Sequence, residues 1–258
     1  MKIAIIGAGN MGGAIVRGLC QNNKNNQNNI SVSNPSQGKL DSLKQEYKDI
    51  YITNDNIVAS QDADIIILAV KPWLVAQVID EISPEPQQIV VSVAAGIDLA
   101  QLDIFLGNQG NPIFRVIPNT AISVNASMTL ISSYNATPQQ EQLLLDLFAP
   151  MGMTMLIAER QMSAATSMTS CGIAYALKYI QASMQAGTEL GIYPKEGMKM
   201  VAQTLKGAAE LILQNDTHPM VEIDKVCTPG GYTIKGINTL DAHGYTTAII
   251  EAIKASQS

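Results

Sequence analysis

Two patterns of hydrophobic and polar positions alternate along the first part of the chain. Short apolar runs have the composition of buried β-strands, and between them apolar residues recur with the spacing of amphipathic helices. Strands are predicted at 2–6, 30–33, 51–53, 64–70, 88–93, 113–117, 127–131 and 153–157, and helices at 10–21, 37–48, 56–60, 72–82, 99–106 and 138–148. This alternation predicts an α/β fold: a Rossmann-like, doubly wound and mainly parallel sheet with helices on both faces.

The pattern changes after residue 158, where the strand signal ends. A long helix rich in small residues is predicted at 163–190, then a helix at 194–213, and shorter helices after Pro229 and Gly244. We therefore expect an α/β domain at 1–158 and an all-helical domain at 159–258. A helical domain of this size buries little surface alone, so we expect it to form a homodimer or higher oligomer.

Composition and charge narrow the classes of partner. Apolar residues make up 47% of the chain and charged residues 15%, which predicts a folded core and some apolar surface for a subunit interface. The formal net charge is −6 and no block of Lys or Arg occurs, which argues against a nucleic-acid or anionic-membrane partner. The Asn- and Gln-rich tract at 21–29 is expected to be a solvated loop.

The cysteines and histidines argue against disulfides and metals. Cys20, Cys171 and Cys227 lie far apart, and the chain has two histidines. We expect neither a disulfide framework nor a metal site, and a reducing, cytoplasmic location. The apolar runs are shorter than the roughly 20 residues that cross a bilayer. The first residues lack the apolar stretch of a signal peptide, so no membrane association is expected.

A glycine pattern follows the first predicted strand. Gly7, Gly9 and Gly12 form G-x-G-x-x-G at the start of the first predicted helix, which is the context of a dinucleotide-binding loop. These glycines would allow a tight turn, close approach of a pyrophosphate, and close packing of helix on strand. The expected cofactor contacts are Gly7, Ala8, Gly9, Asn10, Met11 and Gly12. The alternative is a glycine-rich turn without a ligand.

The end of the second predicted strand bears on the choice between NADP and NAD. NAD-binding proteins place Asp or Glu there for the ribose hydroxyls. This chain has Asn34 and Ser36 instead, with Lys39 nearby, and nothing there would repel a 2′-phosphate. NADP is therefore the expected cofactor, with NAD as the alternative. These residues could instead form only a turn.

Four further segments carry a family resemblance. They are AVKP at 69–72, SVAAGI at 92–97, FRVIPNT at 114–120 and VCTPGGYTIKG at 226–236. With the glycine loop, they make the chain resemble the Δ1-pyrroline-5-carboxylate reductases, which form proline by reducing a cyclic imine with NAD(P)H. The resemblance runs from residue 2 to about residue 254, and the Pro-Gly-Gly-x-Thr motif is its most specific part. It implies a dinucleotide domain followed by a helical dimerisation domain.

The resemblance also implies roles for individual residues. Thr233 is the expected catalytic residue, with a hydroxyl that bonds the imine nitrogen, and free amides near it would bind the substrate carboxylate. A cyclic imine is basic enough to carry its own proton near neutral pH, so no histidine is needed as an acid. The expected substrate contacts are Gly230, Gly231, Tyr232, Thr233 and Cys171. The further cofactor contacts are Asn56, Ala69, Val70, Lys71, Pro72, Ala95, Gly96 and Asn119, although Asn119 could simply stabilise a loop.

The chain departs from the family pattern in places that leave alternatives open. The family has Ser-Gly-Ser-Gly-Pro-Ala-Tyr where this chain has Thr169 to Tyr175, and it commonly has Thr or Ala where Tyr232 stands. Lys225 stands where members often have Asn. Reduction of another cyclic imine is therefore one alternative. A second alternative is a β-hydroxyacid dehydrogenase. It is disfavoured because that class has an asparagine four residues after the helix lysine, whereas this chain has Ala182 four residues after Lys178. The third alternative is a non-catalytic dinucleotide sensor.

Overall fold

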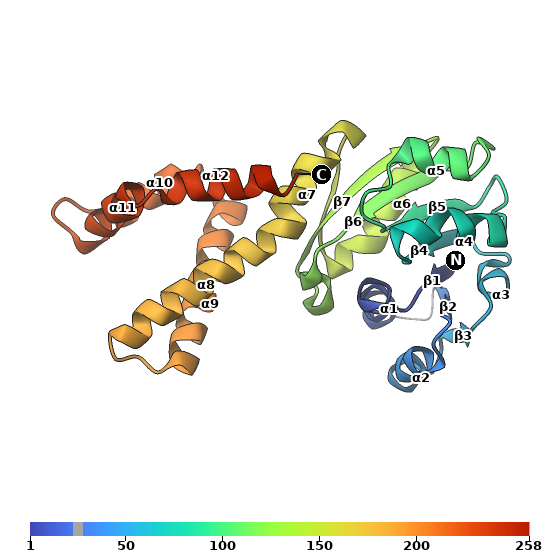
Figure 1. Ribbon diagram of the computed structural model, residues 1–258, viewed down its shortest axis with the longest axis horizontal. Helices are drawn as coiled ribbons and strands as arrows, with labels where there is room; N and C mark the ends of the chain where they lie inside the picture. The colour runs from blue at the N-terminus through green and yellow to red at the C-terminus, as the bar shows by residue number, and fades with distance from the viewer. Residues whose placement is uncertain (23–27, 258) are drawn as a thin grey trace. The chain divides into compact units, whose positions relative to one another are not determined.

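The computed structural model describes residues 1–22 and 28–257. Its described residues form two compact units, Met1–Ser170 and Cys171–Gln257 (Figure 1). The division lies later than the end of the strand signal because residues 159–170 pack with the first unit, where buried Met162 joins Ile117 and Leu130 in a small cluster. The domain boundary at residue 158 remains a prediction.

The described part of the first unit contains an eight-stranded sheet in the order β3-β2-β1-β4-β5-β6-β7-β8. All neighbouring strands are parallel except β6 and β7, which confirms the mainly parallel sheet. Its strands are β1 Lys2–Ile6, β2 Asn29–Ser33, β3 Tyr51–Thr53, β4 Ile65–Leu68, β5 Ile89–Ser92, β6 Ile113–Ile117, β7 Ser127–Tyr134 and β8 Gly152–Leu156. The order reverses at β1, so the carboxyl ends of β1, β2 and β4 border a crevice typical of ligand binding.

Helices cover both faces of the sheet, as the alternation predicts (Figure 1). Along β1, Ile3 and Ile5 face one core, and Ala4 and Ile6 face the other, so the strand carries no polar face. The first core is closed by α1 Asn10–Asn22, α2 Gln37–Glu46 and α6 Pro138–Phe148. The second is closed by α3 Asn56–Ser60, α4 Val75–Ile82 and α5 Leu99–Phe105.

Local capping explains where several helices start. The Thr137 side chain accepts the N–H of Gln140, whose side chain accepts the Thr137 N–H, and Pro138 occupies the first position of α6. Asp98 begins α5 with the same reciprocal arrangement. The short 3₁₀ segments are η1 Pro72–Leu74, η2 Thr120–Val124, η3 Ala149–Met151 and η4 Glu159–Gln161. The predicted start of α6 is confirmed.

The single helix predicted at 163–190 is wrong in one respect. The segment comprises α7 Met162–Thr166, a π-helical turn η5 Ser167–Cys171 and α8 Gly172–Glu189. Thr169 donates its hydroxyl to the carbonyl of Ala165, at 2.9 Å, and Ser170 donates to the carbonyl of Pro118, at 3.1 Å. Such competing side-chain hydrogen bonds disturb the regular helical ladder, and periodicity alone does not reveal them.

The second unit is helical, as predicted, with one helix more than the sequence pattern indicated. Its described helices are α8, α9 Pro194–Asn215, α10 Pro219–Val226, α11 Tyr232–Ala242 and α12 Tyr245–Ala255. The missed helix, α10, starts with Pro219 at its first position, and His218 caps it by accepting the N–H of Met220. A proline at the first helical position was therefore a signal that sequence reading could have used.

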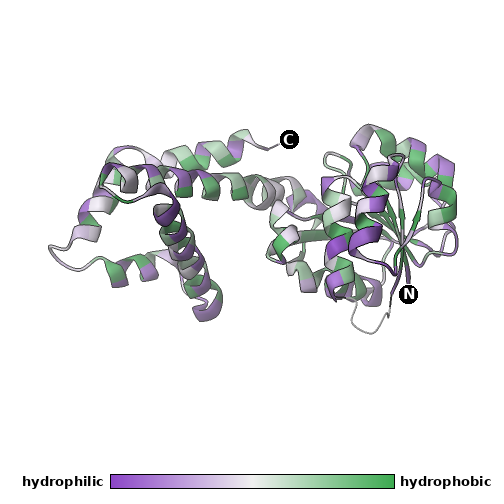
Figure 2. Cartoon of the chain, turned by 90° about the horizontal axis from the view of Figure 1, so that it is seen from below, coloured by the Kyte–Doolittle hydropathy of each residue, from purple (hydrophilic) through white to green (hydrophobic). Residues whose placement is uncertain are grey.

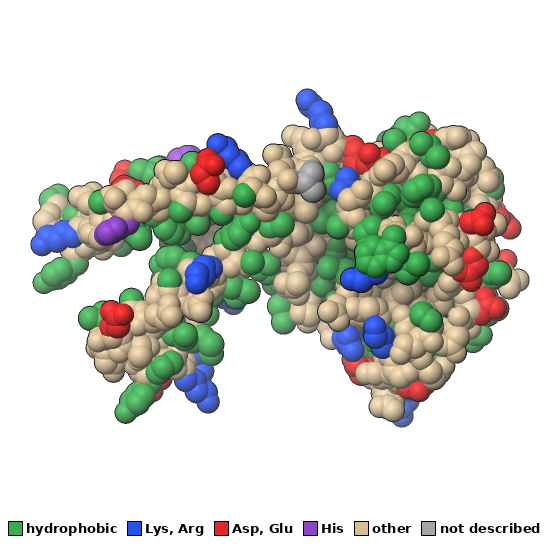
Figure 3. All heavy atoms as spheres, viewed as in Figure 1, with side chains coloured by type: hydrophobic (Ala, Val, Ile, Leu, Met, Phe, Trp, Pro, Cys, Tyr) green, Lys and Arg blue, Asp and Glu red, His purple; other side chains and the backbone are tan. Residues whose placement is uncertain are grey.

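The helical unit has almost no core of its own. Among the described residues of α8 to α12, Gly197 alone is buried. Large apolar side chains are instead exposed, including Leu177, Leu211 and Leu213. In Figure 2 the strands of the sheet are coloured mainly as hydrophobic, whereas the helices of the second unit carry both hydrophobic and hydrophilic residues. Figure 3 shows hydrophobic side chains, in green, on the visible surface of these helices. So much exposed apolar surface is typical of an interaction surface.

Two further expectations concern the Asn- and Gln-rich tract and membrane-spanning helices. In the tract at 21–29, Gln21 and Asn22 end α1 and Asn29 begins β2, while residues 23–27 lie outside the described residues, so the expected loop there is untested. Within 1–22 and 28–257, no helix combines the length and apolar character that a membrane span requires.

Candidate functional site

The glycine loop between β1 and α1 has a separate structural reason for each of its glycines. Gly7 adopts φ +106°, and a Cβ there would lie 2.5 Å from the carbonyl oxygen of Ala69. A Cβ on Gly12 would lie 2.0 Å from the carbonyl oxygen of Gly7, so a side chain would push helix and loop apart. At Gly9, by contrast, no atom lies within 4 Å of the added Cβ. The backbone at Gly9 is therefore open to a ligand.

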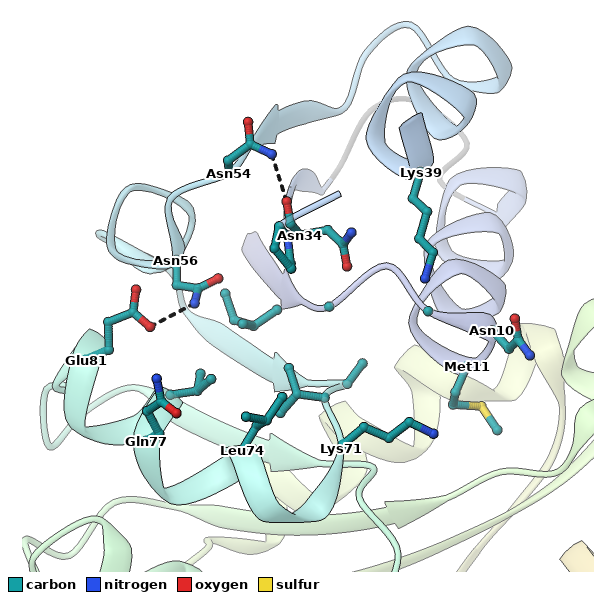
Figure 4. Close-up of a pocket in the computed structure, with 17 residues that line it drawn as sticks. Asn10, Met11, Asn34, Lys39, Asn54, Asn56, Lys71, Leu74, Gln77 and Glu81 are labelled. Carbon is teal, nitrogen blue, oxygen red and sulfur yellow. Dashed lines mark hydrogen bonds between the residues drawn. The ribbon is translucent and has the colours of Figure 1, made fainter. Parts of the chain in front are cut away.

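A cavity of about 690 Å³ lies above this loop at the carboxyl ends of β1, β2 and β4. It collects residues that the sequence analysis assigned to the cofactor from four separate segments (Figure 4). Those residues are Gly7, Gly9, Asn10, Met11, Asn34, Asn56, Ala69, Val70 and Lys71. The sheet thus brings together side chains that lie far apart in the sequence, at the edge where doubly wound sheets bind ligands.

Asn34 connects the end of β2 to the glycine loop. Its side chain is buried, and its amide oxygen accepts the N–H of Ala8 at 3.0 Å. Its amide nitrogen donates to the carbonyl of Ser36 at 3.2 Å, and Asn54 donates to the Asn34 carbonyl at 2.9 Å. An aspartate in this position could not make the same donor contact with Ser36. Asn34 therefore holds the loop in shape as well as lining the cavity.

Two lysines supply positive charge to the cavity. Lys39 comes from α2 and Lys71 follows β4, and Figure 4 shows both side chains extending toward the glycine loop. Among the described residues, neither ammonium group makes a hydrogen bond or ion pair with the protein. Their charge is therefore available to an anionic ligand, together with the N–H groups at the start of α1.

The end of the cavity away from the glycine loop is lined by amides and a carboxylate. Asn56 accepts a hydrogen bond from the Ser33 hydroxyl at 2.7 Å and donates to Glu81 at 2.9 Å. Gln77 of α4 lies beside them (Figure 4). Four of the lining residues were not among those predicted from the sequence: Asn54, Leu74, Gln77 and Glu81. Helical spacing was the available signal, because Leu74, Gln77 and Glu81 share one face of the helix that follows Lys71.

Several predicted cofactor residues do not line this cavity. Ala8 and Gly12 are buried within the loop and helix start, and Ala95 and Gly96 lie in the exposed turn after β5. Asn119 begins η2: its side-chain oxygen accepts the N–H of Ala121, and its amide donates to the carbonyl of Thr169 at 3.4 Å. The residues outside the lining are Ala8, Gly12, Ser36, Pro72, Ala95, Gly96 and Asn119. For Asn119, the contacts are those of a loop-stabilising residue.

In the second unit, a glycine turn leads into α11. Gly230 adopts φ +74°, and the N–H of Gly231 donates to the carbonyl of Thr228 at 3.0 Å. A Cβ on Gly231 would lie 2.7 Å from the Thr228 hydroxyl oxygen. No side chain caps the start of α11. The first backbone N–H groups of the helix therefore have no capping side chain as an acceptor. Thr233 is exposed in the first turn.

The side chains around this turn add charge and an aromatic ring. Tyr232 is 93% exposed, and the Lys235 ammonium lies 5.8 Å from the centre of its ring. Lys225 donates to Glu222 at 2.7 Å, and hydrogen bonds from Lys225 and from Thr217 hold the pKa of the Glu222 carboxyl below its ordinary value. Lys225 is thus paired within its own helix. Cys171 is half-buried at the end of the π-helical turn.

No group of three or more His, Cys, Asp and Glu side chains in the described ranges is arranged to hold a metal ion. The two candidate regions therefore offer hydrogen-bonding groups, lysine charge and free backbone amides for chemistry. The first region suits a phosphate-bearing ligand, and the second suits a small anion.

Comparisons with family models divide the chain between two descriptions. Residues 159–258 match the model described as pyrroline-5-carboxylate reductase dimerisation. Residues 2–96 match the model described as NADP oxidoreductase, coenzyme F420-dependent. The matched ranges correspond to the helical part of the chain and to the segment that contains β1 to β5.

Similar proteins cover nearly the whole chain. The pyrroline-5-carboxylate reductase of Escherichia coli K12 is 36% identical over 98% of this chain and 94% of its own length. The solved pyrroline-5-carboxylate reductase of Coxiella burnetii superposes with a TM-score of 0.90 at 29% identity, over 98% of this chain and 95% of that one. The Plasmodium falciparum pyrroline carboxylate reductase, solved with NADP bound, gives a TM-score of 0.86 at 25% identity, over 99% and 95%.

Proposed function

The chain belongs to the pyrroline-5-carboxylate reductase family and has pyrroline-5-carboxylate reductase activity, and we propose how its residues carry that reaction. The substrate is a five-membered cyclic imine with a carboxylate, and the product is proline. The ring carbon of the C=N bond gains a hydride, and the nitrogen retains a proton. The protein has to hold the hydride donor and the imine in a reactive arrangement.

The cavity at the glycine loop fits a dinucleotide. The space at Gly9 lets a diphosphate approach the backbone, and the start of α1 and the free lysines would face its charge. When bound, the nicotinamide cofactor supplies the hydride. The residues of the cavity bind and orient it: Asn34 keeps the loop in shape, and Asn56 and Gln77 offer amides to its other end.

NADPH is the form of the cofactor that we propose. No Asp or Glu stands directly after β2, where Asn34 begins the turn, and Lys39 offers an unpaired positive charge nearby. Such a site does not repel a 2′-phosphate and gains from its charge. NAD remains the alternative. The preference is measured by comparing kcat/KM for NADPH and NADH.

The turn before α11 is the proposed substrate site. The uncapped amides at the start of the helix, with the open space at Gly230, would bind the substrate carboxylate. Thr233 would bond the imine nitrogen through its hydroxyl. A protonated imine already carries the proton that the product keeps, so this role does not require an acid. The histidine His218, which precedes the turn in sequence, is engaged in capping α10.

The helical unit makes the chain self-associate, since residues 159–258 match a dimerisation family. We propose that the oligomer is a homodimer whose interface covers the exposed apolar faces of α8 to α12. We also propose a cytoplasmic location, supported by the free state of Cys20, Cys171 and Cys227.

One observation carries the proposed division of roles: an uncapped helix start with an exposed threonine follows Gly230 and Gly231. The test is NADPH oxidation by the purified protein with pyrroline-5-carboxylate, together with detection of proline. We expect turnover of this imine and none of β-hydroxyacids. Bound cofactor without turnover at millimolar imine would contradict the proposal, and so would turnover of a hydroxyacid instead.

A further inference from the structure

A continuous series of hydrogen bonds runs from the glycine loop to the other end of the cofactor cavity. The N–H of Gly7 donates to the carbonyl of Ser33 at 2.8 Å. The hydroxyl of the same serine donates to Asn56 at 2.7 Å, and Asn56 donates to the carboxylate of Glu81 at 2.9 Å. Asn56 and Glu81 both line the cavity (Figure 4). The series therefore links the loop, the end of β2, the start of α3 and the end of α4.

The carboxylate at the end of this series fixes which way the Asn56 amide points. An ionised carboxylate only accepts hydrogen bonds, so it requires the amide nitrogen of Asn56 on its side. The amide oxygen then faces Ser33, whose hydroxyl donates to it. With the amide reversed, two oxygen atoms would face each other at Glu81. Because of Glu81, the two orientations of this amide have different energies.

With both bonds made, Asn56 keeps one N–H and one oxygen lone pair for a ligand. We propose that Glu81 is a positioning residue for the cofactor: it holds the Asn56 amide so that these two groups face the adenosine end. This inference rests on the proposed function, since it takes the cavity to bind a dinucleotide with its diphosphate at the glycine loop. The proposed 2′-phosphate contacts, Asn34 and Lys39, lie after β2. Asn56 is bonded to Ser33 at the end of the same strand, so the adenosine end lies on the side of Asn56 and Gln77.

Glu81 acts through Asn56 rather than by touching the phosphates. Its charge is negative, as are the phosphates, so direct contact with them would be repulsive. Its hydrogen bond to an amide that lines the cavity is favourable whether or not a ligand is bound. A glutamine at this position could donate as well as accept, so Glu81→Gln frees the Asn56 amide to reverse, and the cofactor has to select one orientation at a cost in affinity.

The test compares Glu81→Gln, Asn56→Ala and the double variant for binding of NADPH and of its adenosine half, 2′-phospho-ADP-ribose. Trp73, the one tryptophan in the sequence, lies between Lys71 and Leu74 of the cavity wall and serves as a fluorescence reporter. Calorimetry provides an independent measurement. Asp80→Asn is the matched control, because it removes the same charge from a neighbour that does not line the cavity.

We expect Glu81→Gln to raise the Kd of both ligands about fivefold or more, as expected for losing a charged hydrogen bond. The KM for NADPH should rise far more than kcat changes, and Asp80→Asn should behave as the wild type. In the Asn56→Ala background, Glu81→Gln should have no further effect.

Three results would overturn the inference. The first is an unchanged Kd in Glu81→Gln, and the second is an equal loss from Glu81→Gln in the presence and absence of the Asn56 side chain. Glu81→Asp, which retains the charge on a shorter side chain, should lose less affinity than Glu81→Gln, and the reverse order would also count against it. If the wild type binds no NADPH, the proposed function fails instead, so the two failures are distinguishable.

Discussion

At the scale of single residues, the two candidate regions were predictable to different degrees. The G-x-G-x-x-G pattern predicted the position of the cavity because the local backbone geometry requires glycine at Gly7 and Gly12, where there is no room for a Cβ. The amide network of Asn56 and Glu81 was not predictable in the same way. Its partners come from α3 and α4, and only the folded sheet brings these segments together.

Gly9 and Gly12 form a matched pair for testing the loop. Gly12→Ala places a Cβ 2.0 Å from a backbone oxygen, so it should reduce the free energy of unfolding by about 2 kcal/mol or more. Gly9→Ala meets no atom within 4 Å, and its stability should change by less than about 0.5 kcal/mol. It should nevertheless weaken NADPH binding about tenfold or more. Urea denaturation and calorimetry measure the two effects. Equal losses of stability would refute this separation.

Thr233 should affect turnover and leave cofactor binding unchanged. Thr233→Ala removes the hydroxyl proposed to bond the imine nitrogen, so kcat should fall about tenfold or more. The Kd of NADPH should stay constant, because the residues lining the cofactor cavity all belong to the first unit. Thr233→Ser keeps the hydroxyl and should retain most activity. Steady-state kinetics with pyrroline-5-carboxylate measure these effects. A kcat of Thr233→Ala equal to that of the wild type would exclude a catalytic role for the Thr233 hydroxyl.

At the scale of elements, the strands and helices of the first unit follow from the sequence because propensity, periodicity and caps agree there. Two features did not follow. The π-helical turn at Ser167–Cys171 depends on hydrogen bonds such as that of Ser170 to Pro118, which is distant in sequence. The helix α10 has only eight residues, so its periodic pattern covers little more than two turns. Short elements and tertiary hydrogen bonds therefore mark where sequence reading fails.

An ion pair between α1 and α2 should make stability depend on pH. Arg17 makes two hydrogen bonds of 2.7 Å to the carboxylate of Glu46, and these hold the pKa of Glu46 below its ordinary value. A lowered carboxyl pKa stabilises the folded state above the unfolded pKa of about 4.3. That stabilisation is lost as the pH falls through the lowered folded value.

Glu46→Gln should therefore lower the free energy of unfolding at pH 7 by about 0.5 kcal/mol, because the pair is partly exposed and screened by water. The difference from the wild type should shrink as the pH falls below about 4, and it should also shrink in high salt. Urea titrations across this pH range give the measurement. A difference that stays constant with pH would show that Glu46 stabilises the protein by some means other than its charge.

At the scale of the whole molecule, the amino-acid composition by itself indicates self-association. The low charged fraction of 15% leaves too few charged side chains to cover the helices, and the described part of α8 to α12 does expose apolar side chains throughout. The sequence does not indicate which helix faces meet, because amphipathic periodicity does not distinguish a face that packs within the chain from one that packs on a partner.

Folding of the helical unit should therefore depend on association. With Gly197 as the one buried residue among the described parts of these helices, an isolated copy lacks the apolar burial that offsets the entropy of ordering. The temperature of unfolding should consequently rise with protein concentration, as mass action requires for a dimer. Light scattering at micromolar concentration should give the mass of a homodimer or a higher oligomer.

The exposed leucines allow a controlled version of this test. Leu177→Glu, at a position 58% exposed on α8, should weaken association and lower the unfolding temperature, because a charge would be buried in the interface. Ile104→Glu, at a position 65% exposed on α5 of the first unit, is the matched control and should change neither. A wild type that is monomeric at micromolar concentration, with an unfolding temperature independent of concentration, would mean that the apolar helical faces are stable in water without a partner.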